Sequence, residues 1–181
     1  MSRALDRLVA GTPAAWLRVI ECDALIKAFA RAFGVEAPSL RGFTPDEALD
    51  AFRSFTAACM EEALVDGAVA ARYREGIGDE ALALGARVRR LLLVREDDAF
   101  LVTRFFYRGI GIEIAGELPG PLSFEPCAFS RRYSPACCWF MSAFDEGFMR
   151  GITGLVDARL IFSQRLTEGA PCCEASFEVP A

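Results

Sequence analysis

The chain has 181 residues, is 53% hydrophobic and carries a net charge of −5. Its length favours a single domain over residues 1–181, and the apolar fraction is sufficient for a large core. The acidic balance argues against nucleic-acid binding. Because the chain contains seven cysteines and no histidine, histidine triads, histidine general bases and mixed Cys/His zinc sites are excluded.

The first half of the chain, residues 1–87, has the periodicity and the capping residues of helices. The Thr-Pro pair at 12–13 predicts the start of a first helix, which Gly34 ends. The sequence TPDE at 44–47 is a capping box with proline at the first helical position, so it predicts a second helix that runs toward Gly67. Shorter helices are expected over 68–74 and 80–87.

The second half, residues 88–181, changes to the pattern of strands. Two apolar, β-rich runs at 88–95 and 100–107 are separated by four residues and predict a hairpin. The alternation of Ile110, Ile112 and Ile114 predicts a third strand. Further along we expect a strand over 122–125, a helix from Pro135 to about Gly151 or Gly154, and a closing hairpin of 159–168 with 172–179. Helices followed by strands indicate an α+β fold, with amino-terminal helices packed on an antiparallel sheet of about five strands.

Five of the seven cysteines lie between residues 127 and 173, and the predicted elements suggest how some of them converge. Cys127 ends a strand, whereas Cys138 and Asp145 are two turns apart on one helix and share a face. Cys173 begins the last strand on the side of Ala175, which places it toward the core and Cys172 toward solvent.

Arg165 is expected in the preceding strand, in phase with Arg159, Ile161 and Ser163, and it would lower the pKa of a nearby thiol. The candidate catalytic residues are therefore Cys127, Cys138, Cys173 and Asp145, with Asp145 as proton handler. The alternative is structural, because cysteine is among the most buried residue types and Asp145 could lie on an exposed helical turn.

A zinc site made by Cys127, Cys138 and Cys173 is a further alternative. The chain lacks paired CxxC motifs, and adjacent cysteines rarely both bind one ion, so we expect no metal and no cofactor. Three glycines, Gly147, Gly151 and Gly154, lie at intervals of four and three on the predicted helix. They provide a smooth face for close packing or room for a ligand against the backbone.

The segment FSQRLTEGAPCCEASFEV at 162–179 resembles the carboxy-terminal hairpin of the L-2-amino-thiazoline-4-carboxylate hydrolase-like family. The matching positions are Gln164, Leu166, Glu168, Gly169, Cys173 and Phe177. The order Cys127, Cys138, Asp145 is also similar to that family, and the resemblance covers roughly residues 120–179.

The same layout resembles the 4-vinyl reductase-like and TRAPP-component-like ligand domains, in which helices precede an antiparallel sheet. This chain lacks the cysteine that those domains tend to place on the penultimate strand, where Arg165 or Leu166 stands instead. That difference weakens any metal role inferred from them.

These observations predict a small-molecule hydrolase that opens a C–N or C–S bond with a cysteine-centred site, and Arg165 or Arg104 would hold a substrate carboxylate. The alternative is a non-catalytic module that binds a small ligand or a metal. An interaction protein that dimerises through exposed phenylalanines is a third reading. Asp6 interrupts the segment where a signal peptide would be apolar. We therefore expect a cytoplasmic protein with a small-molecule ligand or a second copy of itself as partner, and without a membrane or nucleic-acid partner.

Overall fold

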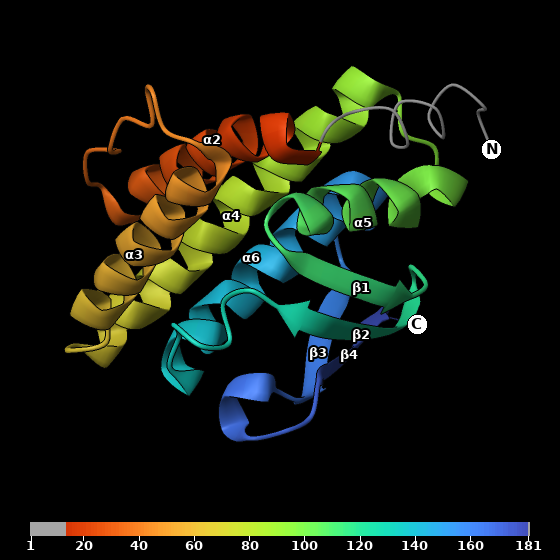
Figure 1. Cartoon of the computed structure of the whole chain (residues 1–181). Coiled ribbons are helices and arrows are strands. Elements are labelled where there is room, and N and C mark those ends of the chain that lie inside the picture. Colours follow the sequence, from red (N-terminus) through yellow and green to blue (C-terminus); the bar gives the residue numbers. More distant parts are fainter. Residues whose placement is uncertain (1–13, 181) are drawn as a thin grey trace.

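The computed structural model describes residues 14–180 and has an α+β architecture, as predicted (Figure 1). Within residues 14–180, five α-helices, two short 3-10 helices and four strands follow one another. Their bounds are α2 (Ala14–Phe33), α3 (Pro45–Ala63), α4 (Gly67–Leu92), η1 (Glu96–Asp98), α5 (Ala99–Gly109), β1 (Ile112–Gly116), β2 (Gly120–Cys127), α6 (Pro135–Thr153), β3 (Arg159–Gln164), η2 (Leu166–Glu168) and β4 (Cys173–Glu178).

The four strands form one antiparallel sheet in the order β1-β2-β4-β3, so the sheet has four strands rather than about five. The helices lie to one side of it, and α6 runs between α4 and the strands (Figure 1). α5 packs beside β1. In the part of the chain that the structure describes, none of the helices combines the length and apolar character needed to span a membrane.

A polar cap followed by proline begins two of the helices, and the one at α3 is the predicted capping box. At α3, the amide of Glu47 donates to the hydroxyl of Thr44 at 3.4 Å, and the Thr44 amide donates to the Glu47 carboxylate at 2.8 Å. Ser134 caps α6 in front of Pro135. The predicted start of the first helix at 12–13 lies outside the described residues, and α2 ends at Phe33, before Gly34.

The hairpin predicted from 88–95 and 100–107 is wrong. The first run continues α4 to Leu92, which also joins the predicted helices 68–74 and 80–87, and the second run is α5. In a short run of apolar residues, the spacing of the side chains does not distinguish a strand from a buried helix. The acidic residues Glu96, Asp97 and Asp98 immediately precede α5, where negative charge stabilises a helix. The helical half therefore extends to Gly109.

The glycines of α6 pack against α4, which resolves their role in favour of close packing. A Cβ added at Gly147 would overlap the carbonyl oxygen of Gly78, and one at Gly151 would overlap that of Leu82. In return, a Cβ at Gly85 of α4 would overlap the carbonyl oxygen of Phe148. The two backbones are thus in direct contact, and α6 is held at a fixed depth between the helices and the sheet.

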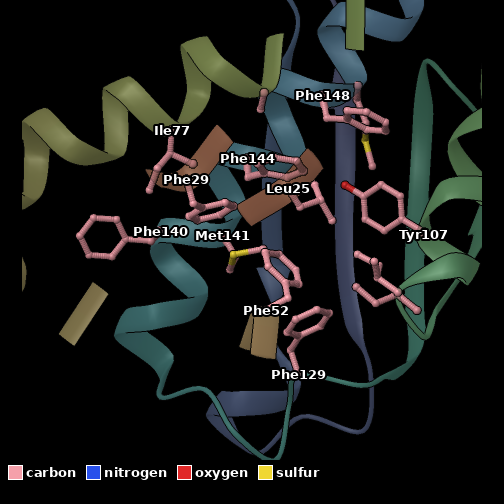
Figure 2. Close-up of a cluster of buried hydrophobic side chains, with 14 of the residues drawn as sticks. Leu25, Phe29, Phe52, Ile77, Tyr107, Phe129, Phe140, Met141, Phe144 and Phe148 are labelled. Carbon is pink, nitrogen blue, oxygen red and sulfur yellow. The ribbon is translucent and has the colours of Figure 1, made fainter. Parts of the chain in front are cut away.

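Aromatic side chains from several elements form the core around α6 (Figure 2). Phe144 of α6 stacks on Phe29 of α2 with ring centroids 5.4 Å apart, and Phe29 meets Phe52 of α3 edge-on. One turn further along the same face of α6, Phe148 stacks on Phe144, and Tyr107 of α5 lies near Phe148 with its hydroxyl turned toward α6 (Figure 2). This hydroxyl is one of the few polar atoms in the cluster, and it contacts the carboxyl group of Asp145.

Candidate functional site

A small cavity of about 60 Å³ lies between the sheet, α5 and α6. It brings together five of the six residues expected from the sequence: Cys127, Cys138, Asp145, Arg165 and Cys173 all line it. The remaining wall is mostly aromatic or apolar and consists of Tyr107, Ile112, Phe124, Phe129, Tyr133, Met141 and Phe162. Segments from residue 107 to residue 173 therefore converge on one small space.

The helix α6 forms one wall of the cavity. Cys138, Met141 and Asp145 are spaced by three and four residues, so they lie on one face of α6, as expected for Cys138 and Asp145. The Tyr107 hydroxyl donates to Oδ1 of Asp145 at 2.6 Å. Tyr107 was not among the expected site residues, because the run that contains it was assigned to a strand.

Two β-bulges turn further side chains into the cavity. The register of β1 with β2 shifts between Ile114 and Ile112, so that Ile112 pairs with Cys127. A regular strand would place residue 126, not 127, on the face of Phe124. The extra residue on β2 therefore brings Cys127 to the inner face.

Arg165 was expected within a strand on the face of Ile161, and this placement is wrong. The strand β3 ends at Gln164, and its pairing with β4 shifts by one residue after Phe162. Ile161 is exposed, whereas Arg165 lines the cavity and its guanidinium lies 4.9 Å from the centre of the Phe162 ring. The bulge thus reverses the side to which Arg165 points.

Cys173 lies on the inner face of the sheet, as predicted. It pairs with Phe124 across β2 and β4, on the same face as the buried Ala175 and Phe177. Cys172 does not line the cavity, and its sulfur contacts Gln164. Both thiols are only partly buried. The two cysteines therefore differ mainly in their surroundings, because Cys173 faces the cavity and Cys172 does not.

Burial raises the pKa of Asp145 from 3.8 to about 7, although the hydrogen bond from Tyr107 and the charge of Arg165 act in the opposite direction. The desolvation of the carboxylate therefore outweighs its two partners. A carboxyl group with this pKa is present in both protonation states near neutral pH. It can accept a proton and return it, which is the requirement for a general acid–base catalyst.

The three thiols are held in the protonated form. Burial raises the pKa of Cys138 to about 12 and also raises the pKa values of Cys127 and Cys173. Cys173 has two compensating partners, because the amide of Leu166 donates to its sulfur at 3.3 Å and the charge of Arg165 favours the thiolate. Cys173 is thus the one of these three cysteines whose thiolate form is favoured by both a backbone amide and a cation.

Arg165 holds its position through contacts outside the cavity. Its Nη1 lies 3.4 Å from Oε1 of Glu168, and its buried Nε has no hydrogen-bond partner within residues 14–180. A guanidinium with an unused donor beside a carboxyl group and a thiol can bind a further anionic or carbonyl oxygen. Arg104 does not line this cavity; it lies on α5, with its guanidinium 5.8 Å from the Phe100 ring centre.

The arrangement of the acidic and thiol side chains bears on the zinc alternative. Among residues 14–180, no group of three or more cysteine, aspartate or glutamate side chains is arranged to hold an ion. The closeness of the thiols therefore does not support the zinc alternative.

Two larger spaces adjoin the small cavity. An outer cleft of about 570 Å³ shares Cys127 with it and is lined by Arg53, Arg131 and Arg132. An apolar chamber of about 470 Å³ on the other side shares Tyr107 and Asp145. Cys127, Asp145 and Tyr107 thus lie between an arginine-lined space and an apolar one, and these neighbouring spaces were not predicted from the sequence.

The chain matches no protein-family model, no curated protein and no solved structure. The function of the chain is therefore inferred from the geometry of the site.

Proposed function

We propose that the chain is a small-molecule hydrolase that opens a C–N or C–S bond with a cysteine-centred site. The observation that carries this proposal is the shared cavity of Cys173, Asp145 and Arg165. A thiol nucleophile, a proton carrier and a cation are the groups that such a reaction needs in one place.

In the proposed reaction, Asp145 accepts the proton of Cys173 while the sulfur attacks the carbon of the C–N or C–S bond. Asp145 then donates that proton to the departing nitrogen or sulfur. Water, deprotonated by the same carboxylate, displaces the Cys173 sulfur from the enzyme-bound intermediate, and the thiol regains its proton. Arg165 stabilises the negative charge that develops on the substrate.

The raised pKa of the Cys173 thiol makes this base necessary, because little thiolate exists near neutral pH before substrate binds. Asp145, with a pKa of about 7, matches the requirement that a general base has a pKa close to the working pH. The cavity of about 60 Å³ admits only the reacting part of a substrate. The rest must extend into one of the two adjoining spaces.

The resemblance of residues 120–179 to the L-2-amino-thiazoline-4-carboxylate hydrolase-like family supplies a first substrate. Incubation with that thiazoline should give a product heavier by one water, detected by mass spectrometry. Cys173→Ala and Asp145→Asn should each lower the rate by about a hundredfold or more. Cys172→Ala is the matched control, since Cys172 is the sequence neighbour of Cys173 but lies outside the cavity, and it should keep the wild-type rate.

Retention of activity in Cys173→Ala would mean that Cys127 or Cys138 is the nucleophile. The corresponding alanine variants would show which of the two it is. Full activity in all three single variants would contradict a thiol mechanism.

The second candidate is a module that binds a small ligand without turnover. The mostly apolar wall of the cavity and its protonated thiols favour it. The two candidates separate in one experiment, because a binding module would retain the thiazoline or another small ligand unchanged.

A further inference from the structure

The apolar chamber lies among α2, α4, α5 and α6 and has a volume of about 470 Å³. This volume is within the usual range for small-molecule sites, which are concave, mostly apolar and equipped with a few polar groups. Its wall includes Leu25, Val88, Phe105, Phe106 and Phe148. At its rim, Ile20 and Leu91 remain 52% and 75% exposed.

Two carboxyl groups interrupt this apolar wall. One is Asp145, which with Tyr107 also lines the small reactive cavity, so the chamber reaches the reactive groups directly. The other is Glu21 of α2. Of the lining residues that the structure describes, Arg87 is the one cation, and it is exposed, so solvent screens its charge.

The position of Glu21 depends on the absence of a side chain at residue 109. A Cβ added at Gly109 would overlap Oε2 of Glu21, so the carboxyl group occupies the space that glycine leaves at the end of α5. The nearby cation, Arg18, is engaged elsewhere: its Nε donates to the Gly109 carbonyl at 2.8 Å and its Nη1 to Asp46 at 2.7 Å. Burial raises the pKa of Glu21 well above its ordinary value, and the charge of Arg18 only partly offsets this.

We propose that this chamber binds an apolar organic amine, with the ammonium group at Glu21 and the hydrocarbon body extended toward Asp145. Charge complementarity selects this class of ligand. A carboxylate or phosphate would bring a like charge beside two carboxyl groups, whereas an ammonium group gains charge-assisted hydrogen bonds that a neutral ligand lacks. The inference rests on the proposed function in one respect, since it makes the occupant a substrate or ligand of the Asp145 site.

Three naphthalene derivatives that differ in their polar group test the proposal: 1-naphthylmethylamine, 1-naphthalenemethanol and 1-naphthoate. Calorimetric titration of the full chain at neutral pH should show the amine binding about tenfold or more tightly than the alcohol, as one charge-assisted hydrogen bond provides. Burial raises the pKa of Glu21, whereas a bound ammonium group favours the ionised carboxylate, so amine binding should also release protons from this group. That release appears as a binding heat that differs between phosphate and Tris buffers.

Glu21→Gln should remove the preference for the amine and the proton release while leaving the affinity for the alcohol. Arg87→Gln is the matched control, a charge change on the same chamber that should leave the preference intact. Equal affinity for amine and alcohol, tightest binding of the naphthoate, or no binding of any of the three to the wild-type chain would overturn the proposal.

The outcomes separate this inference from the hydrolase proposal. Amine binding in a chain that hydrolyses nothing would support the chamber assignment and contradict the proposed reaction. Thiazoline hydrolysis without amine binding would do the reverse.

Discussion

Asp145 is the residue whose environment has the clearest consequence for stability. Its pKa rises from about 3.9 in an unfolded chain to about 7 in the folded one, so between these values the folded state holds a proton that the unfolded state has lost. Stability due to this group is therefore greatest at low pH and falls as pH rises toward 7 and above. Between pH 5 and pH 8, the loss amounts to roughly 2–3 kcal/mol.

Asp145→Asn should remove this loss, because asparagine cannot ionise and can still accept the hydrogen bond from Tyr107. Urea unfolding of both proteins at the two pH values should show the variant gaining roughly 2–3 kcal/mol relative to wild type at the higher pH. Comparison of the two proteins cancels the contributions of other titrating groups. A difference that does not change with pH would mean that Asp145 is a solvated surface carboxylate.

At the residue scale, sequence spacing predicted part of this site. Helical and strand periods were enough to place Cys138 and Asp145 on one face and Cys173 on the inner side of the sheet. The two bulges that turn Cys127 and Arg165 inward were not predictable, because one unpaired residue reverses a strand's phase without an obvious mark in the sequence.

At the scale of elements, the contact of α4 with α6 depends on glycine. Gly85→Ala places a Cβ on the carbonyl oxygen of Phe148, a backbone atom that cannot move without separating the helices. The substitution should lower the free energy of unfolding by about 3 kcal/mol, as over-packing does, measured by urea denaturation. Because α6 carries Cys138 and Asp145, the same variant should also impair binding at the site.

Gly78→Ala, seven residues earlier on α4, is the matched control. Its added Cβ would lie 3.6 Å from the carbonyl oxygen of Ala143, an ordinary contact. This variant should be neutral or gain up to about 1 kcal/mol from the better helix propensity of alanine. Similar losses for both variants would show that the helices are not in the close contact described.

The elements that were assigned wrongly from the sequence are those whose apolar residues show no clear helical or strand period. The capping box at Thr44 and the proline at 135 placed the starts of α3 and α6, and Gly34 marked the end of α2, whereas the apolar runs of α4 and α5 were mistaken for strands. Gly76 and Gly78, which lie between the predicted helices 68–74 and 80–87, also made one long helix read as two. Gly85, further along α4, admits the backbone of α6 at Phe148, and no local pattern in the sequence reveals this tertiary role.

At the scale of the whole molecule, the site exists because two structural layers meet along α6. Residue 107 comes from the helical half, Cys138 and Asp145 from α6, and Cys127, Arg165 and Cys173 from the sheet or its edge (Figure 1). The segregation of helical and strand patterns along the sequence was enough to predict the α+β class, which the structure confirms. The adjoining chamber was not foreseen, because it depends on how four helices fit together.

The central claim is that Asp145 is a buried carboxyl group that changes protonation state near neutral pH beside the thiols. An NMR titration of the aspartate side-chain carbonyl carbons tests it most directly, with Asp145→Asn to identify the resonance. The account predicts a midpoint near the pKa of about 7 and a higher midpoint in Tyr107→Phe, which removes the hydroxyl that favours the carboxylate. A midpoint close to 4, the ordinary aspartate value, unchanged by Tyr107→Phe, would contradict the account.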